Sequence, residues 1–365
     1  MKTILFLGGN KDAWPMVDIA AKMGLRTIVV DGNPNAYTRG NAFLQASCYH
    51  PEEVLSAINN FDIDAVLSAG TDTPHVMAAV AEQKNIVGQS KWTAQYSRDK
   101  ILQAELFDYH GINTPPWRLD NPYDLLDGVV VVKPADSRGA RGVLRLRPGD
   151  SWKEAQQESA KHSPTGRTLF QKWISGIQLS SESLVQDGKI LWTAYSERNY
   201  DKLGMFSPYV IEDGGDMPPD IPLVYEKDYK YICEEELQKC VTALQFDTGT
   251  LKGDLVWNDG CHVIEVATRL SGGGFCEPQI RLCWGVEFVK CAIRLALGEK
   301  LTVAHVWHSD KYNHEADINP KFKNYVCQRY NFNEETKKHP DRGDYVVATG
   351  SSRRTARLKT QEMLG

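Results

Sequence analysis

The chain has 365 residues, of which 42% are hydrophobic and 24% charged, and its formal net charge is −5 at pH 7. This composition is typical of a globular protein of roughly two or three domains, and it excludes a fibrous or intrinsically disordered chain. The mild negative charge argues against binding nucleic acid or an anionic membrane through bulk electrostatics.

The eight cysteines contain no C-x-x-C pair, so the sequence predicts buried, reduced thiols rather than a zinc or redox motif. The first residues, MKTILFLGG, lack the apolar segment and cleavage site of a signal peptide. No run approaches the about 18 apolar residues that a membrane-spanning helix needs. We therefore expect a cytoplasmic protein.

The N-terminal part, residues 1–96, alternates short apolar runs with helical patterns. Alternation of this kind is typical of an open parallel α/β sheet, in which the loops at the carboxyl ends of the strands face the ligand. The predicted strands are Ile4–Leu7, Thr27–Val30 and Ala65–Leu67, the helices are 14–23 and 52–59, and the ligand-facing loops are 8–10, 31–35 and 70–73.

A domain boundary is predicted near residues 88–97, and beyond it the pattern is that of an antiparallel α+β fold. Asp187-Gly188 and Asp259-Gly260 each join two strand-like runs, which is a strong hairpin signal. Residues 204–224 are rich in glycine and proline, which predicts a loop or flap. The predicted helices are 98–109, 151–161, 229–244, 286–297 and 353–363, and the strands are 129–132, 143–146, 168–173, 179–186, 189–196, 251–257, 262–266 and 345–349.

Lys133 directly follows a run of four valines and precedes the glycine-containing segment 136–142. A lysine at the end of a buried strand can pair with phosphate oxygens while the amides of an adjacent loop cap them. The segment lacks the G-x-x-x-x-G-K-[ST] pattern, which excludes a P-loop. A surface lysine before a turn is the simpler interpretation, but the valines favour a fixed side chain.

Asp254 and Glu265 lie on the two runs joined by the second Asp-Gly turn, and Arg269 follows four residues later. Two carboxylates across a hairpin can hold Mg²⁺ against phosphate oxygens, and an arginine beside them can clamp a carboxylate or a phosphoryl group. Glu265 is flanked by apolar residues, so it needs a partner or a metal. The run Ser271–Gly274 can bring backbone close to a ligand.

Taken in order, these segments resemble the ATP-grasp superfamily of carboxylate–amine and carboxylate–thiol ligases over essentially the whole chain. Five motifs carry the resemblance: Asp99-Lys100 with Gly111–Pro115, Val132–Pro134 with its glycine loop, Gln171–Gly176, the pair Asp254 and Glu265, and Arg269 with the glycines after it.

The resemblance implies a fold of mixed α/β and α+β type. An N-terminal open parallel α/β domain would occupy residues 1–96, and an ATP-grasp domain with antiparallel sheets would occupy 97–300. Its lid would be about 115–172 and its core about 173–300. A small C-terminal extension, 301–365, would complete the chain.

The resemblance also implies site residues by position. Arg269, Lys133 and Arg198 would act in catalysis. For Arg198 and Lys202, the role of ordinary exposed loop charges is equally plausible. The cofactor-binding residues would be Lys100, Lys133, Ser137, Gly139, Gly142, Gln171, Trp173, Ile174, Gln178 and Lys202, and the metal ligands would be Asp254 and Glu265.

Three positions depart from the family pattern. Gln178 stands where a glutamate commonly contacts the ribose hydroxyls, and an amide can still form that hydrogen bond without charge assistance. Ala267 replaces the asparagine that completes a second metal site in many members. Gln171-Lys172 replaces the paired acids at the hinge.

The resemblance implies an enzyme that uses ATP and Mg²⁺ (or Mn²⁺) to convert a small-molecule carboxylate into an acyl phosphate and to transfer it to an amine. It implies neither nucleic acid nor membrane as a partner, and a homodimer formed through the first domain. A bicarbonate-dependent carboxylase ranks second. A non-catalytic nucleotide-binding protein and an NAD(P)-dependent dehydrogenase rank below it, and the dehydrogenase is disfavoured because LGGNKDA lacks G-x-G-x-x-G.

Overall fold

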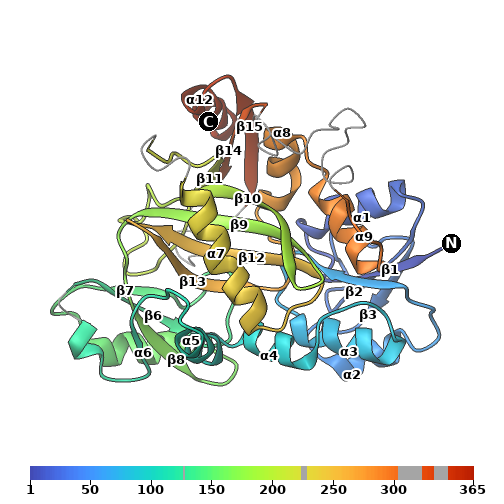
Figure 1. Ribbon diagram of the computed structural model, residues 1–365, viewed down its shortest axis with the longest axis horizontal. Coiled ribbons are helices and arrows are strands. Elements are labelled where there is room, and N and C mark those ends of the chain that lie inside the picture. The colour runs from blue at the N-terminus through green and yellow to red at the C-terminus, as the bar shows by residue number, and fades with distance from the viewer. Residues whose placement is uncertain (126–127, 223–227, 303–322, 333–343) are drawn as a thin grey trace.

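The computed structural model describes residues 1–125, 128–222, 228–302, 323–332 and 344–365 (Figure 1). The N-terminal elements are β1 Thr3–Leu7, α1 Ala13–Lys22, β2 Arg26–Asp31, β3 Ala42–Gln45, α2 Pro51–Ala57, β4 Ala65–Ser68 and α3 Pro74–Lys84. The strands form one parallel sheet in the order β3-β2-β1-β4, which confirms the predicted open parallel α/β arrangement. All five residues of the central strand β1 are buried.

Two consecutive helices, α4 Lys91–Arg98 and α5 Lys100–Tyr109, connect this sheet to the rest of the molecule. The sequence predicted a boundary where α4 lies and a single helix after it. Ser90 accepts a hydrogen bond from the Thr93 amide and begins α4, whereas extended Asp99 accepts from the first amides of α5. Both residues are preferred N-caps. The second cap places Lys100 in the first turn of α5.

A small antiparallel sheet follows, at the lower left of Figure 1. It consists of β5 Trp117–Arg118, β6 Val130–Pro134, β7 Leu144–Leu146 and β8 Thr168–Lys172, in the order β5-β8-β6-β7, and helix α6 Trp152–Ala160 packs against it. Val130, Val132 and Phe170 are completely buried between the sheet and the helix. This packing fixes β6 and carries Lys133 to its end.

The central sheet has seven strands: β9 Ile177–Gln186, β10 Lys189–Asn199, β11 Gly214–Met217, β12 Gly249–Trp257, β13 Cys261–Ala267, β14 Tyr325–Tyr330 and β15 Tyr345–Gly350. They are arranged in the order β13-β12-β9-β10-β11-β14-β15. Helix α7 Asp228–Ala243 crosses one face of the sheet (Figure 1). Helix α9 Phe288–Ala296 contacts β9 and β12 and also packs against α1, so it joins the central sheet to the N-terminal domain. Helices α8 Ile280–Trp284 and α12 Arg353–Leu364 complete the described part.

Four strands were not predicted from the sequence: β3, β5, β11 and β14. β11 lies inside segment 204–224, which the sequence predicted as a loop or flap, and its Gly-Gly-Asp sequence has little intrinsic strand preference. It is a strand because it pairs with β10 on one side and β14 on the other. Buried Asp216 in this strand is paired with Arg329 of β14 and Arg357 of α12.

The predicted division at residues 97 and 301 stays a prediction, although β14 and β15 continue the central sheet without a break. All eight cysteines are free and buried, as the sequence predicted. No helix in the described ranges combines the length and apolar character required to cross a membrane.

Candidate active site

A cavity of about 630 Å³ opens where the N-terminal loops, the small sheet and the central sheet meet. Its volume is within the range typical of small-molecule sites. The loop after β1 contributes Asn10–Asp12, the end of β6 contributes Lys133, and the β12–β13 hairpin contributes Asp254 and Glu265. The cavity therefore lies at the carboxyl edge of the parallel sheet, facing the strands of the antiparallel sheets.

Lys133 is only 5% exposed, and it lines the cavity. Burial lowers the pKa of Lys133 to about 8, with Lys100 acting in the same direction and Glu265 opposing it. Within the described residues its ammonium forms no ion pair with a carboxylate. A buried ammonium group without a carboxylate partner favours the binding of an anion in the cavity.

Lys100 reaches the same region from the start of α5. Its ammonium donates a hydrogen bond to the Ser137 carbonyl oxygen at 2.8 Å and lies 3.6 Å from Oε2 of Glu265. The first contact ties the glycine-containing segment 136–142 to α5. The second contact affects the pKa of Glu265. Burial alone would raise this pKa, but the positive charges of Lys100 and Lys133 hold it below its ordinary value. Glu265 is thus ionised near neutral pH.

Asp254 and Glu265 are directly opposite each other on β12 and β13, as the hairpin pattern predicted. Asp254 is held by two cations: Nη1 of Arg198 lies 2.6 Å from Oδ1, and Nζ of Lys252 lies 2.5 Å from Oδ2. Burial would raise the pKa of Asp254, but Arg198 and Lys252 keep it well below the usual value. Arg198 also pairs with buried Glu212. This half of the site is a chain of alternating charges.

Arg269 faces the N-terminal domain. Its Nε pairs with a carboxylate oxygen of Asp72, from the loop after β4, and its Nη1 donates to the Leu270 carbonyl oxygen at 3.2 Å. Burial would lower the pKa of Arg269, but Asp72 outweighs burial and raises it. The pair fixes the guanidinium at the junction between the two domains, where both residues line the cavity.

The glycine run after Arg269 allows close contact with the loop after β1. The Gly273 amide donates to Oδ1 of Asp12 at 2.8 Å, and the Tyr345 hydroxyl donates to the same oxygen at 3.4 Å. Gly273 has φ +70°, and a Cβ there would collide with the hydroxyl of Tyr330. A side chain is excluded by both the backbone conformation and the space, which explains the glycine.

The hinge end of the cavity is formed by the segment after β8. The Trp173 amide donates to the Val129 carbonyl oxygen at 2.9 Å, which places the backbone of this segment beside β6. The Gln178 side chain donates to the Ile174 carbonyl oxygen at 3.3 Å, and the Arg145 guanidinium lies 5.0 Å from the centre of the Trp173 ring. This end is lined by an aromatic ring and amide groups, whereas Asp254 and Glu265 line the part of the cavity near Lys133.

Most of the residues predicted as site residues line this one cavity. The exceptions are Gly142, where a Cβ would meet His162, and Lys202, whose ammonium lies 5.2 Å from the centre of the Phe332 ring. The roles of all these residues stay predictions. The structure brings together Lys100, Lys133, Ser137, Gly139, Gln171, Trp173, Ile174, Gln178, Arg198, Asp254, Glu265 and Arg269.

Sequence reasoning missed the partners of these residues. Lys252 precedes Asp254 by two positions on one strand, so the alternation of β-strand side chains could have placed both on the same face. Asp72 lies in a loop that the sequence marked as ligand-facing, but nothing in the sequence assigned it to Arg269. Glu212 lies just before β11 and Tyr330 ends β14, and these two strands pair although they are far apart in the sequence. No local sequence signal identifies either residue as part of the site.

Asp254 and Glu265 are the residues that would hold one Mg²⁺ ion together with phosphate oxygens, and an ion there would replace contacts of Asp254 with Arg198 or Lys252. Mg²⁺ in such sites typically takes one or two protein carboxylates, and both oxygen donors here are ionised and line the cavity. The described residues contain no group of three or more His, Cys, Asp or Glu side chains that could hold a metal without a substrate. Ala267 provides no side-chain ligand, in agreement with a single shared ion.

Residues 97–273 match the family described as the ATP-grasp domain. No curated protein sequence matches the chain. The fold is shared with solved structures over the whole chain: an L-amino acid ligase from Bacillus licheniformis has a TM-score of 0.76 and 18% identity, and the alignment covers 100% of this chain and 97% of the other.

Two further structures are similar to the same extent. A carboxyaminoimidazole ribonucleotide synthase from Aspergillus clavatus, complexed with ATP, has a TM-score of 0.75 and 14% identity, with 100% and 97% coverage of this chain and the other. A phosphoribosylglycinamide synthetase from Anaerococcus prevotii has a TM-score of 0.73 and 16% identity, with 100% and 98% coverage. At these identities the likeness establishes a common fold.

Proposed function

Because residues 97–273 match the ATP-grasp domain family, we propose that the protein is an ADP-forming ligase that activates a carboxylate with Mg-ATP and joins it to an amine. The observation that carries the proposal is the cation pair Lys100 and Lys133, facing a cavity together with the opposed carboxylates of Asp254 and Glu265. Phosphoryl transfer requires such preorganised charge more than any covalent participation by the protein.

In the first step, a carboxylate oxygen of the substrate attacks the γ-phosphorus of ATP. The bond from this phosphorus to the bridging oxygen breaks, and ADP leaves with the electron pair. Lys133 and Lys100 neutralise charge on the phosphoryl oxygens, and Arg269 orients the attacking carboxylate. When bound by Asp254, Glu265 and phosphate oxygens, Mg²⁺ would supply further neutralisation of the same charge.

In the second step, the nitrogen of the amine attacks the acyl carbon. The bond from carbon to the phosphate oxygen breaks, orthophosphate leaves, and the nitrogen loses one proton to give the amide. Segment 136–142 must exclude water during this step, because water would hydrolyse the acyl phosphate. The contact between Lys100 and the Ser137 carbonyl oxygen holds this segment over the phosphate end of the cavity.

A screen of small carboxylates with Mg-ATP and hydroxylamine tests the proposal. Hydroxylamine traps an acyl phosphate as a hydroxamate, so a true substrate gives equal amounts of ADP and hydroxamate. Replacing hydroxylamine with mixed amines then identifies the acceptor. Binding of NAD(P)H instead of ATP, or hydroxamate formation without ATP, would contradict the proposal.

A bicarbonate-dependent carboxylase is the second candidate, because the fold matches the carboxyaminoimidazole ribonucleotide synthase almost as well as it matches the amino-acid ligase. Bicarbonate as the only carboxylate that stimulates ADP release would favour it. A non-catalytic nucleotide-binding protein is the third, because Arg198 and Lys252 already occupy Asp254. Tight binding of ATP without turnover on any carboxylate would favour that candidate.

A further inference from the structure

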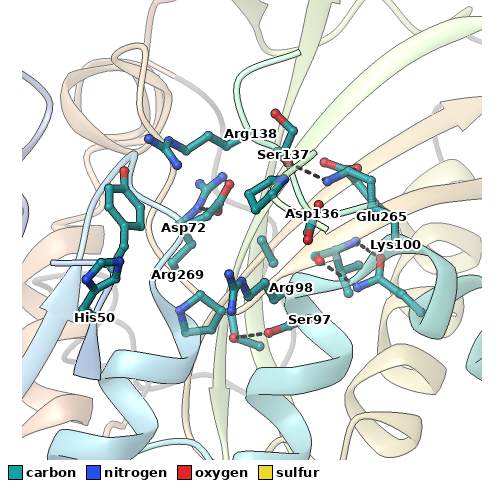
Figure 2. Close-up of a pocket in the computed structure, with 17 residues that line it drawn as sticks. His50, Asp72, Ser97, Arg98, Lys100, Asp136, Ser137, Arg138, Glu265 and Arg269 are labelled. Atoms are coloured by element: carbon teal, nitrogen blue, oxygen red, sulfur yellow. Dashed lines mark hydrogen bonds and ion pairs between the residues drawn. The ribbon is translucent and has the colours of Figure 1, made fainter. Parts of the chain in front are cut away.

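A second, smaller cavity of about 210 Å³ adjoins the large one, and Figure 2 shows the residues that line it. It is bordered by the N-terminal domain at His50 and Asp72, by the junction of α4 and α5, and by the segment after β6. The two cavities share a wall at the phosphate end, and the residues that line both are Asp72, Lys100, Ser137, Arg138, Glu265 and Arg269. Its volume is below the range typical of pockets for drug-sized ligands, and it suits a small ion.

The wall of the small cavity carries four cationic side chains, and two of them are already paired. Lys100 lies beside Glu265, and Arg269 pairs with Asp72. The guanidinium groups of Arg98 and Arg138 form no ion pair with a carboxylate among the described residues.

The remaining acid of this wall, Asp136, has a partner of its own. It accepts a hydrogen bond from the Ser163 hydroxyl at 2.5 Å. The cavity is therefore left with two guanidinium groups that no carboxylate contacts within the described ranges.

These two guanidinium groups approach the cavity from opposite sides. In Figure 2, Arg138 lies at the top of the view and Arg98 at the bottom, with Asp72 and Arg269 between them. The Arg138 guanidinium is stacked over the Tyr49 ring at 4.2 Å from its centre. Stacking on a ring restricts a guanidinium while leaving the N–H groups at its edge free to donate.

Arg98 is held by its position at the last turn of α4. The preceding residue, Ser97, shares a 3.0 Å hydrogen bond with the Thr268 hydroxyl, and this bond joins the end of α4 to the segment after β13. The Arg98 side chain is exposed and lines the small cavity.

We propose that this small cavity binds the orthophosphate released by the reaction, with Arg98 and Arg138 as its donors. The inference rests on the proposed function. A planar, forked guanidinium suits a tetrahedral oxyanion, and two of them on opposite sides can each donate to a different pair of oxygens. The shared wall at Lys100 places the cavity next to the group that the reaction releases.

Product inhibition tests the inference. Initial rates are measured with added inorganic phosphate or added ADP for the wild type, Arg98→Gln and Arg98→Glu. Loss of one charge-assisted contact should weaken inhibition by phosphate by about tenfold in Arg98→Gln, and charge reversal should weaken it further. Inhibition by ADP should change by less than about twofold in the same variants, because Arg98 lines only the small cavity.

The control is Lys91→Gln, which removes a positive charge from the other end of the same helix, where Lys91 pairs with Glu82. It should leave both inhibition constants at the wild-type values. Equal phosphate inhibition in Arg98→Gln and the wild type, or equal weakening of phosphate and ADP inhibition, would overturn the inference.

A binding measurement separates the inference from the proposed function. Calorimetric titration of the ADP-loaded protein with inorganic phosphate requires no turnover, and affinity should fall in Arg98→Gln relative to Lys91→Gln. If no carboxylate is activated but this difference appears, the ligase proposal fails and the anion site stands. If turnover is found and phosphate affinity is unaffected by Arg98→Gln, or bicarbonate binds in place of phosphate, the anion site fails and the ligase stands.

Discussion

The two ends of the large cavity are built in different ways. At the phosphate end, Lys100, Lys133, Asp254 and Glu265 come from separate elements between residues 100 and 265, and each is fixed by a helix start or a strand. On the side that faces the N-terminal domain, called the opposite end below, the contacts join three distant parts of the sequence: Asp12, the glycine run after Arg269, and the tyrosines of β14 and β15.

The difference separates two tasks. Charges for phosphoryl transfer must be rigid, and packed strands hold them within a narrow range of positions. Recognition of the second substrate can vary, and contacts between loops of separate domains allow this without disturbing the phosphate end. We therefore expect substitutions at the phosphate end to affect turnover, and substitutions at the opposite end to affect the choice of substrate.

The largest effect is expected for Lys133→Ala. It removes the buried cation of the phosphate end and should lower the rate of ADP formation at least about 100- to 1000-fold, in line with the loss of a preorganised electrostatic group. ADP release by a coupled assay measures the effect. Lys189→Ala, which removes an exposed lysine of β10, is the control and should behave as the wild type. Normal turnover in Lys133→Ala would contradict the assignment.

Glu265→Gln should have the next largest effect. It preserves shape but removes one of the two carboxylates that would hold Mg²⁺, so turnover should fall about 100-fold and the requirement for Mg²⁺ should shift to higher concentration. A magnesium titration of the rate measures both quantities. A variant with an unchanged magnesium dependence would show that Glu265 is not a metal ligand and that the phosphate end works differently.

A pH profile sharpens the comparison further. The pKa of Lys133 is about 8, so the side chain is charged below that pH and neutral above it. The value of kcat/KM for ATP, which reports the free enzyme, should therefore decline above this pKa by about tenfold per unit. Lys133→Arg retains the charge and should not show this decline. A profile that stays flat to about pH 9.5 in the wild type would exclude Lys133 as the titrating group.

At the opposite end, Asp12→Asn should have the smallest effect. It weakens the contacts of the carboxylate with the Gly273 amide and the Tyr345 hydroxyl, each of which is a single hydrogen bond. The KM for one of the non-nucleotide substrates should rise about five- to tenfold, with the KM for ATP unchanged. An equal change in both constants would show that the two ends are not independent.

Local patterns were sufficient to predict the strands that carry Lys133, Asp254 and Glu265. Asp187 and Gly188 both have positive φ, +53° and +71°, as the tight hairpin turn between β9 and β10 requires, and dipeptides of this type are recognisable in a sequence. The second Asp-Gly turn joins β12 and β13 as predicted, and a bulge between Asp254 and Leu255 then shifts the register so that Asp254 lies opposite Glu265. These features depend on residues that are neighbours along the chain.

The opposite end and the partner charges could not be predicted, because their contacts join distant segments. Asp72 and Arg269 are 197 residues apart, and nothing in the local pattern of either residue specifies its partner. Strand β11 has a sequence that favours a turn, and only its pairing with β10 and β14 makes it a strand. Tertiary packing overrides local preference in such cases.

The order of strands in the central sheet has a consequence for synthesis on the ribosome. β11 lies between β10, which precedes it, and β14, which is made much later. The roughly one hundred residues between them take about 5 to 20 s to translate at ordinary rates, and during this time one edge of β11 has no partner. An unpaired strand edge promotes aggregation. β11, however, has only four residues, among them two glycines and an aspartate, and such a strand is a poor template for intermolecular pairing. The sequence features that prevented the prediction of β11 as a strand would therefore also reduce aggregation of the nascent chain.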